Sequence, residues 1–407
     1  MGVPNLEREA KRLLDFARAS ALPSGGFGYL DGDGKVDSSK PLELWINCRM
    51  IQSFGLGHLH GLSDSKDLVE LVDLVELVEH GVNGLLNLFE DKNNGGFFSA
   101  VTPDGKFVST EKMAYDHMFV LLAASTAKVV GVKGADELFE KIDAVIDSKF
   151  WDPQHRMMHN SWNQEFSLLD SYHGINANMH AVEALISAYE VTKEVKYRDR
   201  ALSICERTMV EIVMKNDFLL PEHFDENWQV LKDFNSDRPA DPFRPFGVTI
   251  GHLLEWARFV LQVKLIAPTE MKMEWADVGA KGMYEAAKKY GWGADGSDGF
   301  IYTMDWQRKP VVKERMHWVA AEAAMTSWTL HHFTGEGIYL EDYEKWWSYI
   351  DQYLIDKEKG SWFHELNARQ EVSTSTWEGK PDIYHALNAC LLAMYPMSPS
   401  FIGATLR

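Results

Sequence analysis

Hydrophobic positions recur at helical spacing along nearly the whole chain. Apolar residues at i, i+3, i+4 and i+7, interrupted by Gly, Pro and Asp, predict about twelve helices. We expect them over residues 4–21, 41–60, 65–90, 111–130, 134–149, 175–192, 195–214, 248–266, 270–289, 313–333, 338–356 and 380–395. No linker rich in Pro, Gly, Ser or charge divides the sequence, so residues 1–407 are predicted to form a single domain.

Short strand-like segments around turn residues stand between pairs of predicted helices. They occur at residues 26–29, 96–98, 299–302 and 360–363. The first two are followed by the turn sequences Asp31-Gly32 and Asp104-Gly105, as in β-hairpins. The repeating unit is therefore a hairpin followed by two helices, present about six times.

Every second predicted helix carries a polar or aromatic residue in its first turns. These residues are Arg49, His117, His180, His252, Trp318 and His385. Successive spacings of 68, 63, 72, 66 and 67 residues exceed the roughly 33–47 residues of common helical solenoids. Six helix pairs closing into a ring predict an all-α (α/α)6 barrel with short hairpins at one mouth. Another all-helical arrangement is the alternative.

Charge and cysteine usage narrow the class of protein. The chain has 41 Lys and Arg against 60 Asp and Glu, a net charge of −19, which argues against nucleic acid or an anionic membrane as partner. No uncharged apolar stretch reaches about 18 residues and the first twenty residues are rich in charge, so a cytoplasmic location is expected. Cys48, Cys205 and Cys390 lack disulfide or zinc spacing and are predicted to be buried thiols.

Two pairs of candidate residues share a helix face. Trp45 and Arg49 are four residues apart, as are Asn176 and His180, so each pair points in one direction. A buried Arg49 needs an anionic or hydroxyl-rich partner. That partner is either a ligand or an acidic residue in a structural ion pair.

The remaining candidates suggest proton transfer. His252 and Glu255 lie at i, i+3, which would let the carboxylate sit beside the imidazole and raise its basicity, as in a general base. Trp318 and Glu322 share a face, and His385 begins the last helix. A single histidine on an apolar face is more often a core residue, but three at matching places in separate repeats form a more specific signal.

This combination of residues suits a sugar. Aromatic rings stack on its C–H face while polar groups bind its hydroxyls. Imidazoles move protons at neutral pH and an arginine holds a developing oxyanion, so the implied chemistry is proton abstraction next to a carbonyl. The sequence contains no HExxH, Walker-type, GxGxxG or GxSxG motif. It also offers no converging set of carboxylates and histidines, so neither a metal nor a cofactor is expected.

Four stretches of the sequence resemble a known family. They are residues 44–50, 176–184, 251–256 and 377–385. With them, the chain resembles the N-acylglucosamine 2-epimerase superfamily from residue 26 to residue 389, and in particular its aldose–ketose isomerase branch. The resemblance implies a metal-independent (α/α)6 barrel that acts on a monosaccharide through a cis-enediolate.

The resemblance also implies roles for individual residues. His252 would move the proton between C2 and C1, His385 would be the second acid/base, and Arg49 would stabilise the enediolate oxygens, with Glu255 positioning substrate and histidines. The other residues expected to bind or surround the substrate are Trp45, Tyr115, Asn176, His180, Arg244, Trp318, Glu322 and His364.

The substrate is expected to be a neutral sugar. Sulfoquinovose isomerases of this branch tend to carry Gln at the positions of His364 and Pro381, and without those amides a sulfonate loses donors. We therefore expect interconversion of D-mannose and D-fructose, with D-lyxose and D-xylulose as a side reaction. Alternatives are a sulfoquinovose isomerase, a 2-epimerase of N-acylglucosamine or cellobiose, a glycoside hydrolase or lyase, and a non-catalytic scaffold. The oligomeric state is left open.

Overall fold

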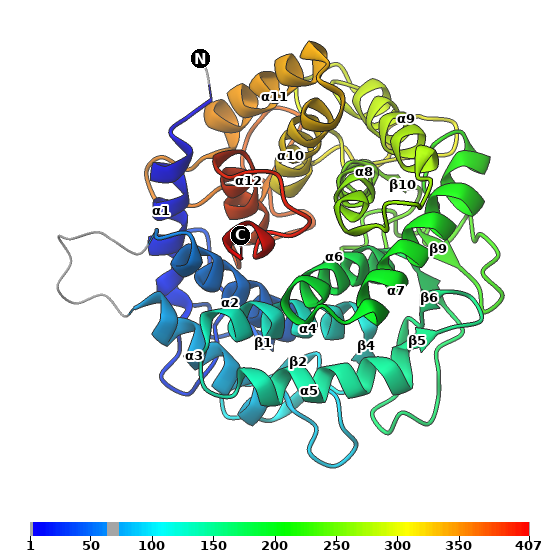
Figure 1. The fold of residues 1–407 in the computed structure, drawn as a ribbon. Coiled ribbons are helices and arrows are strands. Elements are labelled where there is room, and N and C mark those ends of the chain that lie inside the picture. Colours follow the sequence, from blue (N-terminus) through cyan, green and yellow to red (C-terminus); the bar gives the residue numbers. More distant parts are fainter. Residues whose placement is uncertain (1–2, 63–72, 407) are drawn as a thin grey trace.

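The fold is a ring of helices in two layers (Figure 1). The computed structural model describes residues 3–62 and 73–406. Within them, the inner layer consists of α2 (Leu44–Leu59), α4 (Ala114–Val130), α6 (Ile175–Thr192), α8 (Ile250–Val263), α10 (His317–Thr334) and α12 (Tyr384–Met394). The outer layer consists of α1 (Leu6–Ala17), α3 (Leu74–Gly84), α5 (Ala135–Val145), α7 (Val195–Glu206), α9 (Glu274–Gly291) and α11 (Gly337–Tyr349). This arrangement confirms the predicted (α/α)6 barrel.

The two layers differ in their hydrophobic pattern. Every residue of α8 from Ile250 to Val263 is buried, because an inner helix is covered by neighbours on all sides. The outer helix α7 buries only one face, which includes Tyr197, Ala201 and Ile204. The three cysteines are buried and free, as predicted.

Short strands join each repeat to the next. Their bounds are β1 (Leu42–Glu43), β2 (Ala100–Val101), β3 (Phe107–Ser109), β4 (Lys112–Met113), β5 (Trp151–Asp152), β6 (Met157–Met158), β7 (Ser161–Trp162), β8 (His173–Gly174), β9 (His223–Phe224), β10 (Val248–Thr249), β11 (Thr303–Met304), β12 (Arg315–Met316) and β13 (Glu365–Leu366). The strand before an inner helix pairs, antiparallel, with a strand of the following repeat, as in β1 with β2, β4 with β7, β8 with β9, β10 with β11, and β12 with β13.

The same junctions cap the inner helices. The first backbone amide of an α-helix has no acceptor within its own helix. In five inner helices that amide donates to a backbone carbonyl of the following repeat. These acceptors belong to Ser99, Asn160, Glu222, Tyr302 and His364, at 2.8–3.1 Å. The hairpin segments are thereby fixed above the N-terminal ends of the inner helices.

The first and last repeats close the ring. Helix α1 packs against α12, and Figure 1 shows these blue and red elements side by side. The Lys380 amide donates to the Leu30 carbonyl at 2.9 Å, and the Trp362 indole Nε1 donates to Glu9 at 3.0 Å. The barrel therefore depends on contacts between residues more than 340 positions apart in the sequence.

The opposite end of the inner ring is covered by the segment that follows α12. The Tyr395 hydroxyl donates to the His60 carbonyl at 3.2 Å, and the Ser400 amide donates to the Glu190 carboxylate at 3.0 Å. Ile402 is buried beneath. Figure 1 places this end of the chain inside the ring of helices. We refer to residues 395–405 as the C-terminal plug.

Some expected boundaries differ from the structure. The expected helices at 111–130 and 313–333 begin later, because Lys112–Met113 and Arg315–Met316 are strands that pair with the next repeat. The first part of the expected helix at 65–90, up to residue 72, lies outside the described residues. The repeat marker His117 accepts the Phe97 backbone amide at 3.0 Å and so holds a hairpin segment. Among the described helices, none is both long and apolar enough to cross a membrane.

Candidate active site

A cavity opens at the mouth formed by the N-terminal ends of the inner helices. The space between its lining atoms, counting the part that is open to solvent, is about 720 Å³. The residues that line it are Trp45, Arg49, Tyr115, Asn176, His180, Pro242, Phe243, Pro245, His252, Glu255, Tyr302, His317, Trp318, His364, Trp377, Pro381, Asp382 and His385.

Helical spacing explains much of this lining. Residues four apart lie on one helix face, and many lining residues are the second or sixth residue of an inner helix. Those residues are Trp45 and Arg49 of α2, Tyr115 of α4, Asn176 and His180 of α6, Glu255 of α8, Trp318 of α10 and His385 of α12. The structure thus brings together candidates that are far apart in the sequence.

His252 is anchored by a carboxylate from another repeat. Its Nδ1 lies 2.9 and 3.0 Å from the two carboxylate oxygens of Glu222, which directly precedes β9. The expectation that Glu255 occupies this place was wrong. The Glu255 carboxylate instead lies 3.8 Å from Arg258, on the next turn of the same helix.

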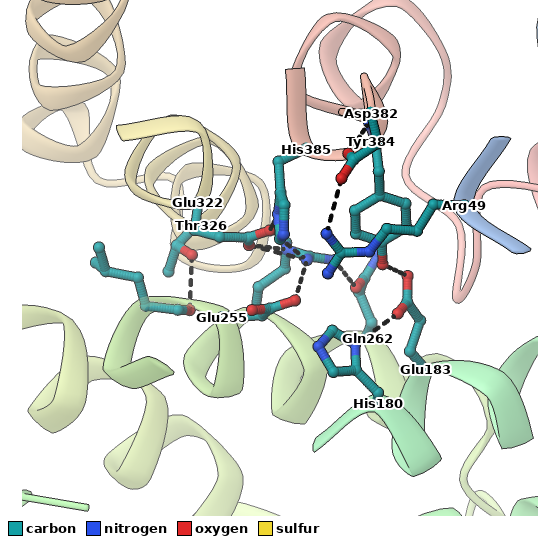
Figure 2. A network of polar contacts seen from close by, with 12 residues as sticks. Arg49, His180, Glu183, Glu255, Gln262, Glu322, Thr326, Asp382, Tyr384 and His385 are labelled. Atoms are coloured by element: carbon teal, nitrogen blue, oxygen red, sulfur yellow. Dashed lines mark hydrogen bonds and ion pairs between the residues drawn. The ribbon is translucent and has the colours of Figure 1, made fainter. Parts of the chain in front are cut away.

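His385 is anchored in the same manner. Its Nδ1 lies 3.0 Å from Glu322 of α10. The Arg258 guanidinium clamps that carboxylate through two hydrogen bonds, from Nε at 2.9 Å and from Nη2 at 3.1 Å. Figure 2 shows the side chains of His385, Glu322 and Glu255 converging on one place.

These anchors fix how the two imidazoles can react. A carboxylate beside Nδ1 holds the proton on that nitrogen, which leaves the Nε2 lone pair directed at the substrate space. The rings of His252 and His385 lie 5.4 and 5.6 Å from the Trp318 ring. All three side chains line the cavity, so two possible bases border the same space.

Arg49 supplies positive charge at the cavity wall. Its guanidinium donates to Asp382 at 3.3 Å and to the Tyr115 hydroxyl at 3.2 Å. It also lies within 4.8 Å of the ring centres of Trp45, Phe119 and Tyr384, and its buried Nε has no hydrogen-bond partner among the described residues. The arginine thus makes the structural ion pair and still faces the cavity with donors available to an anion.

Burial keeps several cavity histidines neutral. Burial, followed by the charge of Arg49, lowers the pKa of His385 well below its ordinary value. Burial also lowers the pKa of His180, although Glu183 lies 3.2 Å from its Nδ1. The pKa of His364 falls to about 3, again mainly through burial. At neutral pH these side chains are proton acceptors or neutral donors, not cations.

Arg258 lies closer to the carboxylate of Glu322, at 2.8 Å, than to that of Glu255, at 3.8 Å. Burial, followed by repulsion from Glu322, raises the pKa of Glu255 well above its ordinary value. Burial also raises the pKa of Glu322, but the charge and hydrogen bonds of Arg258 oppose that effect. These effects favour the negative charge on Glu322 and a proton on Glu255, whose side chain lines the cavity.

A cluster of two carboxylates and one histidine has the composition of a metal site. Glu255, Glu322 and His385 place possible ligand atoms within 4.8 Å of one another. Arg258 already donates to both oxygens of Glu322, and its positive charge would repel a divalent cation at this place. The donor set fits an arginine-clamped carboxylate better than a metal centre.

Two predicted site residues do not reach the cavity wall. Glu322 lies behind the wall under His385, as described above. The Arg244 guanidinium stacks on the Tyr172 ring at 4.2 Å, where a cation gains from the aromatic face. Its neighbours Pro242, Phe243 and Pro245 line the cavity in its place. His364 does line the cavity, but its Nε2 is engaged with the Asp382 carbonyl at 3.2 Å.

Sequence reasoning missed several residues of the site. The lining residues Tyr302, His317 and Asp382 were not assigned, nor was Glu222, which holds His252. An aromatic group at the mouth was missed as well. In that group the Phe243 ring lies 6.3 Å from Trp45 and 5.3 Å from Trp377. Phe243 sits in a polar loop between helices, where no periodic pattern signals that a side chain crosses the mouth.

Comparison with known proteins agrees with this geometry. The pattern of the N-acylglucosamine 2-epimerase (GlcNAc 2-epimerase) family matches residues 25–389. The chain is 40% identical to D-mannose isomerase of Thermobifida fusca over 98% of this chain and 96% of that protein. It is 40% identical to D-mannose isomerase of Pseudomonas cannabina pv. alisalensis, over 98% and 94% of the two chains.

Solved structures show the same architecture. A crystal structure of D-mannose isomerase superposes with a TM-score of 0.85 at 25% identity, covering 95% of this chain and 96% of the other. Cellobiose 2-epimerase from Spirochaeta thermophila superposes with a TM-score of 0.80 at 20% identity, covering 94% and 92%. Fold and cavity thus define a helical-barrel protein whose cavity contains three histidines, His180, His252 and His385, each with Nδ1 on a carboxylate. The chain belongs to the N-acylglucosamine 2-epimerase family.

Proposed function

We propose that this protein is an aldose–ketose isomerase that interconverts D-mannose and D-fructose without a metal, with D-lyxose and D-xylulose as a side reaction. The observation that carries the proposal is the pair His252 and His385, which both line the cavity beside Trp318 and each hold Nδ1 on a carboxylate. The full-length similarity to proteins named D-mannose isomerase supports the choice of reaction and substrate.

The chemistry requires one hydrogen to move from C2 to C1. His252 Nε2 takes the C2 proton of the open-chain aldose and returns it to C1, passing through a cis-enediolate. His385 helps to open the sugar ring and moves the proton between the two oxygens. Arg49 stabilises negative charge on the enediolate oxygens. Glu255 donates its proton in a hydrogen bond to a sugar hydroxyl.

The charge of the cavity favours a neutral sugar. Arg49 is the one cationic side chain among the described lining residues, and the enediolate requires it. His364 is neutral because burial lowers its pKa to about 3, and its Nε2 is engaged with Asp382. A sulfonated sugar would therefore find no second cation to balance its permanent charge.

Incubation with D-mannose in excess EDTA tests the proposal directly. Fructose that accumulates toward an equilibrium mixture, resolved by chromatography, is the expected result. Glucose without fructose would make the protein a 2-epimerase, which returns the proton to the opposite face of C2. If mannose stays unchanged, the proposed substrate is wrong, and sulfoquinovose, N-acylglucosamine and disaccharides are the next substrates to assay.

Replacing the proposed proton carrier tests the mechanism. His252→Ala is expected to lower kcat by at least about 10²–10⁴-fold, the usual contribution of a positioned acid or base, with an unchanged circular dichroism spectrum. The matched control is His332→Ala, at the far end of α10 from the mouth, which should retain wild-type turnover. Substantial activity in His252→Ala would assign the C2 proton to another residue.

A further inference from the structure

Arg258 lies outside the cavity wall yet touches the groups that form it. Its side chain is 1% exposed, and it is absent from the residues that line the cavity. Both of its contacts to Glu322 are short and charge-assisted, and Glu322 in turn accepts from His385 at 3.0 Å. One guanidinium thus stands directly behind a proposed proton carrier.

Arg258 is itself held from the closed end of the barrel. Its Nη1 donates to the Gln262 side-chain oxygen at 3.0 Å. The Gln262 amide nitrogen then donates to the backbone carbonyl of Ser398 at 3.3 Å, in the C-terminal plug. An unbroken chain of hydrogen bonds therefore runs from the plug through Gln262, Arg258 and Glu322 to His385.

The charges around Arg258 show why its placement matters. Glu255 lies on its own helix, Glu322 on α10, Glu183 on α6 and Tyr384 on α12. Without a cation among them, three buried carboxyl groups would surround a small volume, and repulsion would force protons onto more than one of them. An arginine guanidinium can donate to both oxygens of one carboxylate, whereas a lysine ammonium would make a single contact.

We propose that Arg258 is a positioning residue for the proposed isomerase reaction: it keeps Glu322 ionised and oriented so that His385 presents Nε2 to the substrate, and the C-terminal plug holds Arg258 in place through Gln262. The kinetic part of this inference rests on the proposed function. The part that concerns the state of His385 does not, because it is measured on the protein without substrate.

Two variants test the inference at different positions of the chain of hydrogen bonds. Arg258→Lys keeps the charge and loses the two-pronged contact. Gln262→Leu keeps the arginine and removes its link to the plug. Arg315→Lys is the matched control, because Arg315 is equally buried and makes two 2.7 Å hydrogen bonds to Asp295 in a hairpin, but neither residue lines the cavity.

The first readout is ¹⁵N NMR of the His385 side chain, assigned with His385→Asn. The wild-type protein and Arg315→Lys should show one neutral tautomer protonated at Nδ1. Arg258→Lys and Gln262→Leu should show a mixture of tautomers, with the larger change in Arg258→Lys. A single unchanged tautomer in both variants would overturn the inference and leave Arg258 a purely structural residue.

The second readout is steady-state turnover of D-mannose. Arg258→Lys is expected to lower kcat by about 10- to 100-fold, as for other residues that orient a reactive group, with KM within about twofold, because no group that touches the substrate is removed. Gln262→Leu should lower kcat less, and Arg315→Lys should leave it unchanged. Equal kcat in all three variants would also overturn the inference. A wild-type protein inactive on mannose would instead refute the proposed function, and the NMR result would still decide the role of Arg258.

Discussion

Each of the two proposed proton carriers, His252 and His385, depends on a carboxylate that comes from a neighbouring repeat. Glu222 reaches His252 from the segment before β9, and Glu322 reaches His385 from α10. A carboxylate in this position both orients the ring and stabilises the imidazolium that forms when Nε2 takes a proton. The reactivity of each histidine is therefore set by contacts across a repeat boundary.

Replacement of the first of these carboxylates should impair proton transfer. In Glu222→Gln the amide cannot stabilise an imidazolium as an anion does, so kcat is expected to fall by about 10²–10⁴-fold. Steady-state kinetics with D-mannose measure the effect. Glu226→Gln, an exposed substitution four residues further on, is the control and should behave as the wild type. A Glu222→Gln enzyme with normal kcat would show that His252 needs no anionic partner.

The proton on Glu255 predicts a decline of activity at high pH. Its pKa is raised, so it loses the proton only as the pH climbs well above the ordinary range of a glutamate. The donor to the sugar then disappears and a second negative charge develops beside Glu322. Glu255→Gln keeps a neutral donor and should keep activity within about threefold at neutral pH, while Glu255→Ala should lose about tenfold or more.

The pH–rate profile of kcat/KM distinguishes these cases. The wild-type profile should have an alkaline limb that Glu255→Gln lacks. If both enzymes lose activity over the same alkaline range, the limb belongs to another group.

Several candidate residues could be predicted from the sequence, and the reason is helical periodicity. Trp45 with Arg49, and Asn176 with His180, each lie four apart, and a helix brings both members of a pair to one face. Glu222 could not be paired with His252, because 30 residues and a loop separate them. Arg244 was placed at the cavity from a resemblance, and the aromatic face of Tyr172 attracts its side chain elsewhere.

At the scale of elements, the same type of turn occurs in six hairpin segments, and the helical pattern of the sequence does not reveal it. The turn residues are Asp31, Thr102, Asn163, Asp225, Asp305 and Asn367, and each accepts a backbone amide four residues further on. The residue three positions before the turn supplies the carbonyl that caps an inner helix in five repeats. Among these residues are Glu222, Tyr302 and His364, so an alignment of the turns would have found Glu222.

A second repeated device fixes the hairpins to the helices. Asp91, Asp295 and Asp356 each bind a basic side chain that stands 20 to 24 residues further on, close before an inner helix. For the first, Lys112 donates to Asp91 at 3.0 Å with both side chains buried. Burial would raise the pKa of Asp91, but hydrogen bonds from Asn94 and Lys112 outweigh it and lower the pKa.

Loss of this buried pair should destabilise the protein. Asp91→Asn leaves the Lys112 ammonium buried without a counter-charge and is expected to cost about 3–5 kcal/mol in the free energy of unfolding. Because the folded pKa of Asp91 is lowered, its contribution is fully present above the unfolded value, about pH 4, and is lost as the pH falls through the folded value. Chemical denaturation at pH 7 and near pH 3 measures both effects.

A nearby exposed pair provides the control for that substitution. Lys106 and Asp104 also form an ion pair at 2.7 Å, but both side chains are well exposed. Solvent screens such a pair, so Asp104→Asn should leave the denaturation midpoint unchanged. If Asp91→Asn is no less stable than Asp104→Asn, the buried pair contributes nothing to the stability of the hairpin.

At the scale of the whole molecule, the stability of the ring depends on the contacts between its first and last repeats, which we call the seam. Glu9 of α1 accepts from Trp362 at 3.0 Å and from Arg12 at 2.7 Å. Glu9→Ala leaves the buried Trp362 indole without an acceptor and should lower the free energy of unfolding by about 1–3 kcal/mol. Thermal denaturation measures it. Glu7→Ala, at an exposed position of the same helix, is the control, and an equal midpoint in both variants would contradict a role for the seam.

The six-fold repeat could be predicted from the sequence, but the closure of the ring could not be followed in detail. Hydrophobic periodicity predicts the number of helices and their grouping into pairs. It does not reveal that the Lys380 amide bonds to Leu30, or that the residues after α12 turn back beneath the barrel. These contacts join segments at opposite ends of the sequence, and only the packed ring brings them together.

The contact between Arg49 and Asp382 spans 333 positions of the sequence. A ribosome that adds about 5–20 residues per second needs roughly 20–70 s to synthesise the chain between them. Through that interval the nascent chain carries Arg49 without its carboxylate and inner helices without their last neighbour. Because an incomplete ring exposes apolar surface that would otherwise be buried, chaperones that shield nascent chains have a long window in which to act on this protein. The cavity cannot be complete before residue 385 has been added.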